Sequence, residues 1–128
     1  CIRDSVYTFS FNFHTDVYSG ISHYKLLIDS TEVTLARRTL ASAYDGNHQA
    51  TLKMYFDYPI LIDSSIAADD IANAKLKSWT SAKTIKMQGR EYSSSYQASL
   101  HKNSWWDGTG ASGTNNVSIP TLSIKAIA

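Results

Sequence analysis

The sequence predicts an all-β fold, an antiparallel sandwich or barrel with little helix, and three observations support this. Apolar and polar residues alternate with a period of two along several segments, which is typical of half-buried strands. About eight such segments are separated by turn signals, and only one short stretch has helical spacing. Aromatic residues make up 12% of the chain, with eight Tyr and only two Pro, a composition that favours strands.

The strand expected first, from Tyr7 to His14, has the clearest pattern. Aromatic residues occupy every second position and polar residues fill the positions between them, so the rings share one face. Each ring buries on the order of 150–250 Å², and four rings on one face would seed most of a core. The four aromatic residues are Tyr7, Phe9, Phe11 and Phe13.

A hairpin and a further strand are expected next. Tyr24, Leu26 and Ile28 share one face, the polar run 29–32 forms a turn, and residues 33–37 return as the second strand. After another turn signal at 42–48, residues 50–58 alternate again. Pro59 either ends that strand or places it at a sheet edge, because proline has no backbone N–H to donate.

The second half of the chain has shorter elements. Residues 64–74 are expected to form one short helix or a long loop, and 75–79 a short strand. Residues 84–92 and 96–100 are expected to pair as strands through a serine turn. In the closing strand, 117–128, the apolar positions change parity at Pro120, which predicts a bulge. The residues expected to be mostly buried are Phe9, Phe11, Leu52, Met54, Phe56, Ile85, Leu100, Leu122 and Ile124.

The length and the net charge of the chain limit the classes of protein to which it can belong. A chain of 128 residues is one domain, 1–128, that can bury a real core. Because only five residues precede the first strong strand, we expect this domain to be the C-terminal part of a longer chain. The net charge of +1 and the scattered basic residues argue against nucleic acid as a partner. No apolar run approaches the roughly 20 residues of a membrane helix, so no membrane insertion is expected.

The sequence gives no support for a metal, a cofactor or an enzyme. The single cysteine, Cys1, rules out an internal disulfide and favours a fragment boundary, with a lipid-modified mature end as the alternative. The four histidines lack the spacing of a zinc site. No Gly-x-Ser-x-Gly motif is present, and spacing alone selects no pair of carboxylates for glycoside hydrolysis. We therefore expect a non-enzymatic protein.

The best candidate for a binding site is the loop from Asn103 to Asn116, which is expected to project from one end of the sandwich. Two adjacent tryptophans in a strand point to opposite faces, so one indole is expected inward and the other presented. Sugar binding needs an aromatic face beneath the ring and polar groups around its hydroxyls. The residues that supply these groups are Trp105, Trp106, Asp107, His101, Asn115 and Asn116. The alternative is that both tryptophans are structural, one in the core and one at a subunit interface.

Several segments together resemble a known family. The segments are "VYTFSFNF", "YKLLIDSTEV", "AKTIKMQGREY" and the closing "IPTLSIKAIA". Their arrangement is similar to the C1q/TNF-like jelly roll, and especially to the receptor-binding tip domains of bacteriophage tail fibres and related virion proteins. The resemblance implies a jelly-roll β-sandwich that assembles as a homotrimer at the virion surface.

This resemblance implies a recognition function. The expected role is host attachment, with a cell-surface glycan or receptor as the partner and the tryptophan loop as the contact. Two alternatives stay open. One is a purely structural domain for virion assembly or decoration, and the other is a secreted, extracellular C1q-like or lectin-like binding protein. A fold alone does not fix a function, so the choice among these functions depends on the site.

Overall fold

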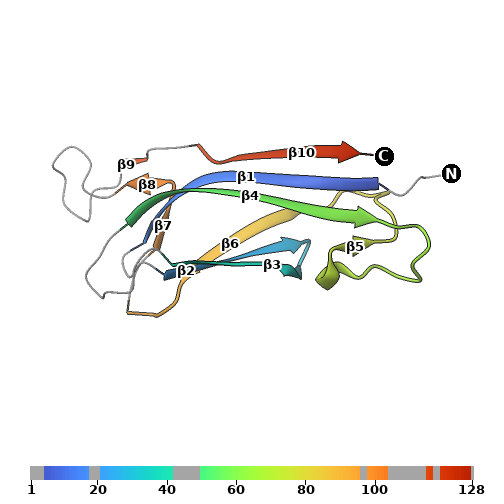
Figure 1. The fold of residues 1–128 in the computed structure, drawn as a ribbon, viewed down its shortest axis with the longest axis horizontal. Coiled ribbons are helices and arrows are strands. Elements are labelled where there is room, and N and C mark those ends of the chain that lie inside the picture. Colours follow the sequence, from blue (N-terminus) through green and yellow to red (C-terminus); the bar gives the residue numbers. More distant parts are fainter. Residues whose placement is uncertain are drawn as a thin grey trace.

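The computed structural model describes residues 5–17, 21–41, 50–95, 98–103, 115–116 and 119–127 (Figure 1). Within these ranges the chain is all-β, and two sheets pack face to face as a sandwich. This confirms the predicted fold class at the level of an all-β sandwich. One 3-10 turn, η1 (Ile71–Asn73), is the sole helical element among the described residues.

The larger sheet is built around the first strand. Its path runs β10-β1-β4-β5, and β7 pairs with the last residues of β1. β1 and β4 are antiparallel along their whole length, whereas β4 and β5 are parallel. The strands are β1 (Ser5–Val17), β4 (Ala50–Ile62), β5 (Lys75–Leu76), β7 (Ala98–Leu100) and β10 (Thr121–Ile127).

The smaller sheet has the order β3-β2-β6, and both of its pairings are antiparallel. Its strands are β2 (Ile21–Ile28), β3 (Thr31–Ala41) and β6 (Ile85–Glu91). The hairpin predicted from the sequence is confirmed, because β2 and β3 are joined by a turn at Asp29–Ser30. Two more short strands, β8 (Lys102–Asn103) and β9 (Asn115–Asn116), pair with each other at one end of the molecule (Figure 1).

The aromatic face of β1 lies in the core, as its alternation predicts. Phe9 is fully buried, Phe11 and Phe13 are nearly so, and Trp79 packs on Phe9 with ring centroids 5.7 Å apart. The prediction of burial is also confirmed for Met54. Phe56 and Ile85 are half-buried and pack against the core, and the side chain of Leu52 lies outside the described residues.

A chain of buried hydroxyls joins the two sheets inside this core. Ser22 Oγ donates to Tyr24 Oη at 2.9 Å, and Tyr24 Oη donates to Thr15 Oγ1 at 2.9 Å. Ser22 and Tyr24 belong to β2, whereas Thr15 belongs to β1. All three residues are buried, so each hydroxyl needs such a partner to offset its desolvation. The hydrogen bonds therefore fix the position of β2 over β1.

β4 passes through Pro59, which pairs with Thr8 in the register, and continues to Ile62. The backbone N–H groups of Leu61 and Asp63 donate away from β1, to the carbonyls of Ala74 and Leu76. By alternation the nitrogen of Pro59 points to that same outer side, and β5 pairs with β4 there only from Leu61 onward. Pro59 therefore does not end the strand, and it lies where β4 is at the edge of the sheet.

The loop reading of residues 64–74 is nearer to the structure than a regular helix, because only η1 forms there. This segment still contributes to the core. Ala74, in the left-handed conformation with φ of 59°, is buried against it. The short strand predicted at 75–79 is present as β5.

The prediction that residues 96–100 pair with β6 is wrong. β7 pairs with β1 instead, with Leu100 opposite Thr15, so the chain crosses from the smaller sheet to the larger one after the serine turn. The prediction that Leu100 is buried is also wrong. Its exposed fraction is 38%, because β7 adds only a short strand beside the end of β1.

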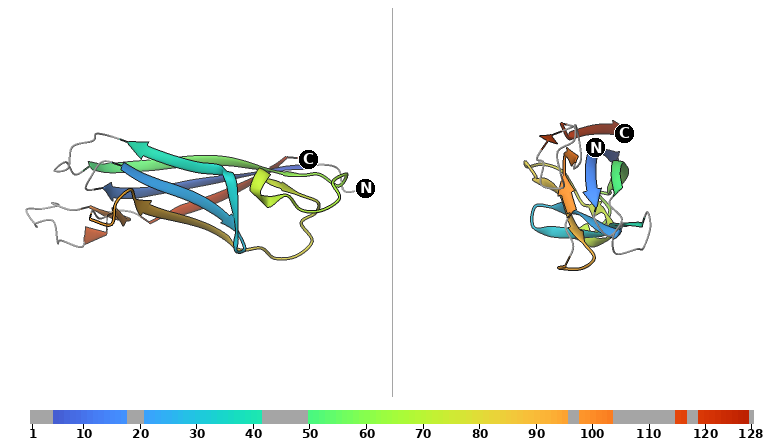
Figure 2. Two further views of the ribbon diagram at one scale, coloured as in Figure 1. Left: turned by 90° about the horizontal axis from the view of Figure 1, so that it is seen from below. Right: turned by 90° about the vertical axis from the view of Figure 1, so that its left-hand side faces the viewer.

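The prediction that Leu122 and Ile124 are buried is wrong as well, although their parity is right. They lie opposite Phe11 and Phe9 of β1, on the face that points toward the smaller sheet. Their exposed fractions are nevertheless 44% and 56%. Phe9 and Phe11 of β1 are buried, whereas their neighbours in β10 are exposed. The smaller sheet therefore extends over β1 but not over β10 (Figure 2).

Candidate functional site

The outer face of the smaller sheet carries a cluster of charged and polar side chains. Strand alternation places Tyr24, Leu26 and Ile28 of β2 in the core and the residues between them on the outside. The register then sets His23 beside Arg90 and Lys25 beside Gln88 of β6. These side chains therefore share one face across two neighbouring strands.

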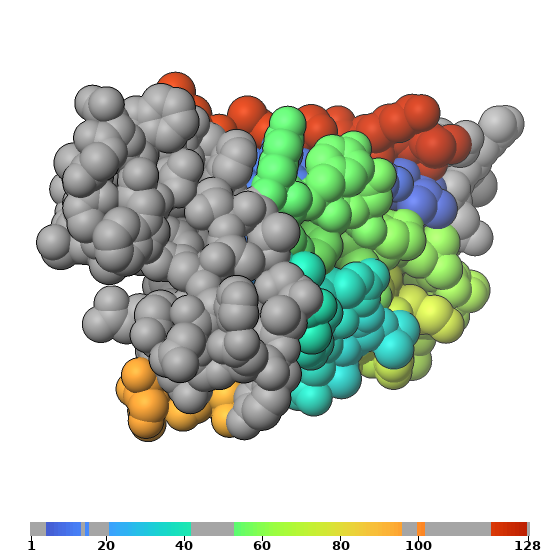
Figure 3. All heavy atoms as spheres, turned by 60° about the vertical axis from the view of Figure 1, so that its left-hand side comes forward, coloured from blue at the N-terminus to red at the C-terminus, as the bar shows by residue number. Residues whose placement is uncertain are grey.

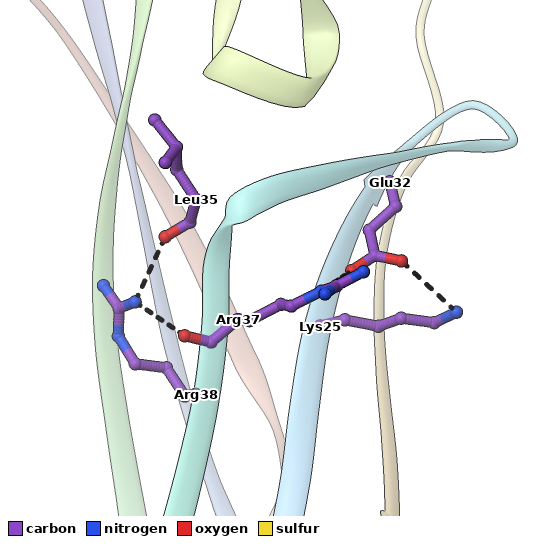
Figure 4. Close-up of polar contacts among 5 residues, drawn as sticks. All are labelled: Lys25, Glu32, Leu35, Arg37 and Arg38. Carbon is purple, nitrogen blue, oxygen red and sulfur yellow. Dashed lines mark hydrogen bonds and ion pairs between the residues drawn. The ribbon is translucent and has the colours of Figure 1, made fainter.

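A wide bulge in β3 shapes this face. Leu26 pairs with Val33 but Tyr24 pairs with Arg38, so Lys25 alone faces residues 34–37 of β3. The extra residues turn Ala36 into the core and leave Leu35 outside. Because a bulge re-aims the side chains that follow it, Arg37 comes to face β2 on the outer side of the sheet (Figure 4).

An open hollow of about 710 Å³ lies over this part of the sheet. Its polar walls come from all three strands of the sheet, and β7 adds an apolar wall at one end through Leu100. The charged and polar residues that line it include His23, Lys25, Glu32, Arg37, Thr39, Gln88 and Arg90. We call this hollow the basic groove.

Positive charge dominates this face of the sheet. Among the residues that the structure describes, this face carries the cations Lys25, Arg37, Lys86 and Arg90 and the carboxylate of Glu32, a net charge of +3. The whole chain has a net charge of only +1, so the remainder of the molecule is negative by two units. The face is thus positive by arrangement rather than by composition, and it attracts anions.

Glu32 holds two of these cations in place (Figure 4). Arg37 Nε donates to Glu32 Oε1 at 2.5 Å, and Lys25 Nζ lies 3.9 Å from Glu32 Oε2. The hydrogen bond from Arg37 lowers the pKa of Glu32 and raises the pKa of Arg37. His23 Nδ1 and Thr39 Oγ1 lie 2.9 Å apart and share a hydrogen bond on the same face.

Arg38 turns to the other side of β3 and stabilises the bulge (Figure 4). One guanidinium nitrogen, Nη1, donates to the carbonyl oxygens of Leu35 and Arg37 at 3.3 and 2.9 Å. The guanidinium carbon also lies 5.7 Å from the ring centre of Tyr58 in β4, a cation–π arrangement. Burial raises the pKa of the Tyr58 hydroxyl. Arg38 thus stabilises the bulge and the contact with β4, and both Arg37 and Arg38 border the groove.

The arrangement suits binding of an anion. Guanidinium groups bind carboxylates and sulfates through two parallel hydrogen bonds, and a neutral amide such as that of Gln88 can add directional contacts. Among the residues that the structure describes, no three His, Cys, Asp or Glu side chains gather as they would around a metal ion. In the same ranges, no helix is long and apolar enough to cross a membrane.

The structure describes only some of the residues of the site that the sequence predicts. Trp105, Trp106 and Asp107 lie outside the described residues. Asn115 and Asn116 form β9, whose backbone pairs with Asn103 and Lys102 of β8. The base of the tryptophan loop is thus a two-residue ladder at one end of the sandwich (Figure 1).

His101 lies just before that base, with a positive φ of 64°. Its ring meets Phe13 edge-on with centroids 6.2 Å apart, and its Nδ1 is buried with no hydrogen-bond partner among the described residues. It lines a second hollow of about 190 Å³, whose walls include Tyr24, Met87 and Leu100. The same three residues border the basic groove. The structure therefore brings His101 next to the groove.

The basic groove was not predicted from the sequence. Its signal was present, because Lys86 and Arg90 share one parity in the segment 84–92, and so do His23 and Lys25 in β2. The sequence pattern does not show that β2 pairs with β6, or that a bulge brings Arg37 to the same face. Both depend on contacts between segments far apart in the sequence.

Comparison with protein family models, with curated proteins and with solved structures found no match.

Proposed function

We propose that this chain is a non-enzymatic recognition module that binds an anionic group of a cell-surface glycan or receptor in the basic groove. One observation supports this most directly. Three neighbouring strands carry cationic side chains on one open face, and among the described residues of that face Glu32 is the only carboxylate. A sulfate or carboxylate on a sugar supplies the complementary charge.

The shape of the groove favours a glycan over a small molecule. It is an open hollow on the face of a sheet rather than an enclosed cavity, and polar side chains flank the cations along it. Arg37 and Arg90 would take the anionic group, and Gln88 and Thr39 would contact neighbouring hydroxyls. His101 and the base of the tryptophan loop lie at the Leu100 end, so a longer glycan could reach both.

The finer fold and the setting are part of the same proposal. The packing of two sheets supports a C1q/TNF-like jelly roll, and the resemblance to tail-fibre tips supports a place at the virion surface. A secreted, lectin-like protein would use the same groove. The threefold assembly that the resemblance implies stays a prediction, and the mass of the chain in solution tests it.

A glycan array probed with the whole chain tests the proposed function. We expect sulfated or sialylated glycans to bind and their neutral counterparts not to bind. Arg90→Glu should weaken that binding at least about tenfold, since it reverses a charge in the groove. Lys53→Glu makes the same change in net charge at an exposed position of β4, and it should leave binding nearly unchanged.

Two results would contradict the proposal. The first is binding that ignores the charge of the glycan, and the second is an equal loss of affinity in both variants. Circular dichroism of the two variants serves as the control for folding, because both side chains are exposed on strands.

A further inference from the structure

β10 forms one edge of the larger sheet and is exposed along its whole length. It pairs with β1 on one side through residues 121–127, and no described strand pairs with its other side. All seven of its residues are exposed, and the space-filling view shows β10 along the rim of the molecule (Figure 3). Such an edge presents a row of backbone N–H and C=O groups that are ready to pair with another strand.

One face of this edge strand is apolar. Leu122, Ile124 and Ala126 lie on the side that faces the smaller sheet, in register with the core aromatics of β1. The smaller sheet does not reach them, so the core continues into an exposed apolar row. Apolar side chains left in water in such a row are typical of a surface that another chain covers.

The strand also lacks most of the features that keep sheet edges from pairing. Proteins protect such edges with charges, prolines or bulges. β10 has one charged residue, Lys125, and its proline, Pro120, stands just before the strand rather than inside it. An edge of this composition is suited to pairing.

The sequence of β10 complements itself. If two copies pair antiparallel about Ile124, each Ile124 meets its equivalent and Leu122 meets Ala126 of the other copy. On the opposite face Ser123 meets Lys125, so no two like charges stand directly opposite each other. Every position of the apolar row is thus matched by an apolar residue.

We propose that β10 binds β10 of a second copy of this chain, and that the two larger sheets join into one continuous sheet across a twofold axis. Such an interface is isologous, because the same residues serve on both sides. A threefold axis cannot pair a strand with its own equivalent, so this contact predicts a dimer and not the trimer implied by the family resemblance. The proposal is independent of the basic groove.

Sedimentation of the whole chain over about 1–100 µM tests the dimer. The wild type should have twice the mass of the chain. Ile124→Lys should sediment as a monomer, since it places two ammonium groups opposite each other on the axis. Leu35→Lys is a matched control, because Leu35 is 58% exposed against 56% for Ile124 but lies on the β3 bulge. It should remain a dimer.

A disulfide test covers the case in which Ile124→Lys does not fold. In a Cys1→Ser background, Ile124→Cys should cross-link to a covalent dimer on mild oxidation, and Leu35→Cys should not. A wild-type monomer or trimer across the whole concentration range would overturn the proposal. So would an Ile124→Lys variant that stays dimeric, or equal cross-linking of both cysteine variants.

Discussion

Tyr24 shows how much of the molecule depends on single residues. Its ring packs against Phe13 at 5.4 Å and Phe56 at 5.7 Å, and its hydroxyl takes part in the hydrogen bonds to Ser22 and Thr15. These contacts hold the ring in place. On the neighbouring strand β6 the residue opposite Tyr24 is Gly89, which leaves room for the ring.

Gly89→Ala should destabilise the protein. A Cβ at this position would lie 2.9 Å from Cε1 and 3.0 Å from Cδ1 of Tyr24, closer than carbon atoms pack. Since Phe13, Phe56 and the two hydroxyl hydrogen bonds hold the ring, we expect a loss of about 1–3 kcal/mol in the free energy of unfolding, as for other overpacked sites. Urea unfolding measures it. Gln88→Ala, one residue away and exposed, should change stability by less than about 0.5 kcal/mol, and equal stability of both variants would contradict the packing argument.

Residue-scale features are also the ones that the sequence predicts best. The alternation of Tyr7, Phe9, Phe11 and Phe13 identifies both the strand and its buried face, because side-chain direction in a strand depends only on position along it. Burial of Met54 follows from the same rule. These predictions need no knowledge of which strands are neighbours.

At the scale of strands and their pairs, the sequence predicts less. The β2–β3 hairpin is local and was predicted, but the bulge between Tyr24 and Leu26 has no sequence signal of its own. The partner of β7 and the exposure of Leu122 and Ile124 depend on where the second sheet ends. The basic groove has the same origin, since its cations come from three strands.

The charge of the groove depends on pH through Glu32, which belongs to the strand pair β2–β3. The pKa of Glu32 is lowered, so its carboxylate contributes stability at pH above its ordinary unfolded pKa. That contribution is lost as the pH falls through the lower, folded value. When Glu32 accepts a proton in that range, it no longer offsets Arg37 and Lys25, and the groove gains one unit of positive charge.

Binding of a sulfated glycan should therefore tighten as the pH falls through the folded pKa of Glu32, which lies below its ordinary value, because a sulfate ester keeps its charge there. Titration calorimetry between about pH 3 and 6 measures this. Glu32→Gln should bind more tightly than the wild type at neutral pH and should lose the increase at low pH. Asp57→Asn, an exposed carboxylate of β4, is the control and should keep the wild-type profile. A wild-type affinity that does not change in this range would contradict the role of Glu32.

At the scale of the whole molecule, the two proposed surfaces lie on different sheets. The basic groove is on the outer face of β3, β2 and β6. The dimer edge is β10, which belongs to the larger sheet (Figure 2). A twofold axis at β10 would leave both grooves open in the dimer. Two open grooves on one rigid assembly can engage two anionic groups of the same surface at once, which raises the apparent affinity without any new contact.

This combination predicts a difference between surface binding and solution binding. On a surface densely coated with a sulfated glycan, the wild type should bind at least about tenfold more tightly than Ile124→Lys, because the variant presents one groove and the dimer presents two. For a single short sulfated glycan in solution, the two proteins should have the same affinity per chain. Surface plasmon resonance at high and low coating density measures the first, and titration calorimetry measures the second. If Ile124→Lys loses affinity equally in both measurements, β10 affects the groove directly and the bivalent explanation is wrong.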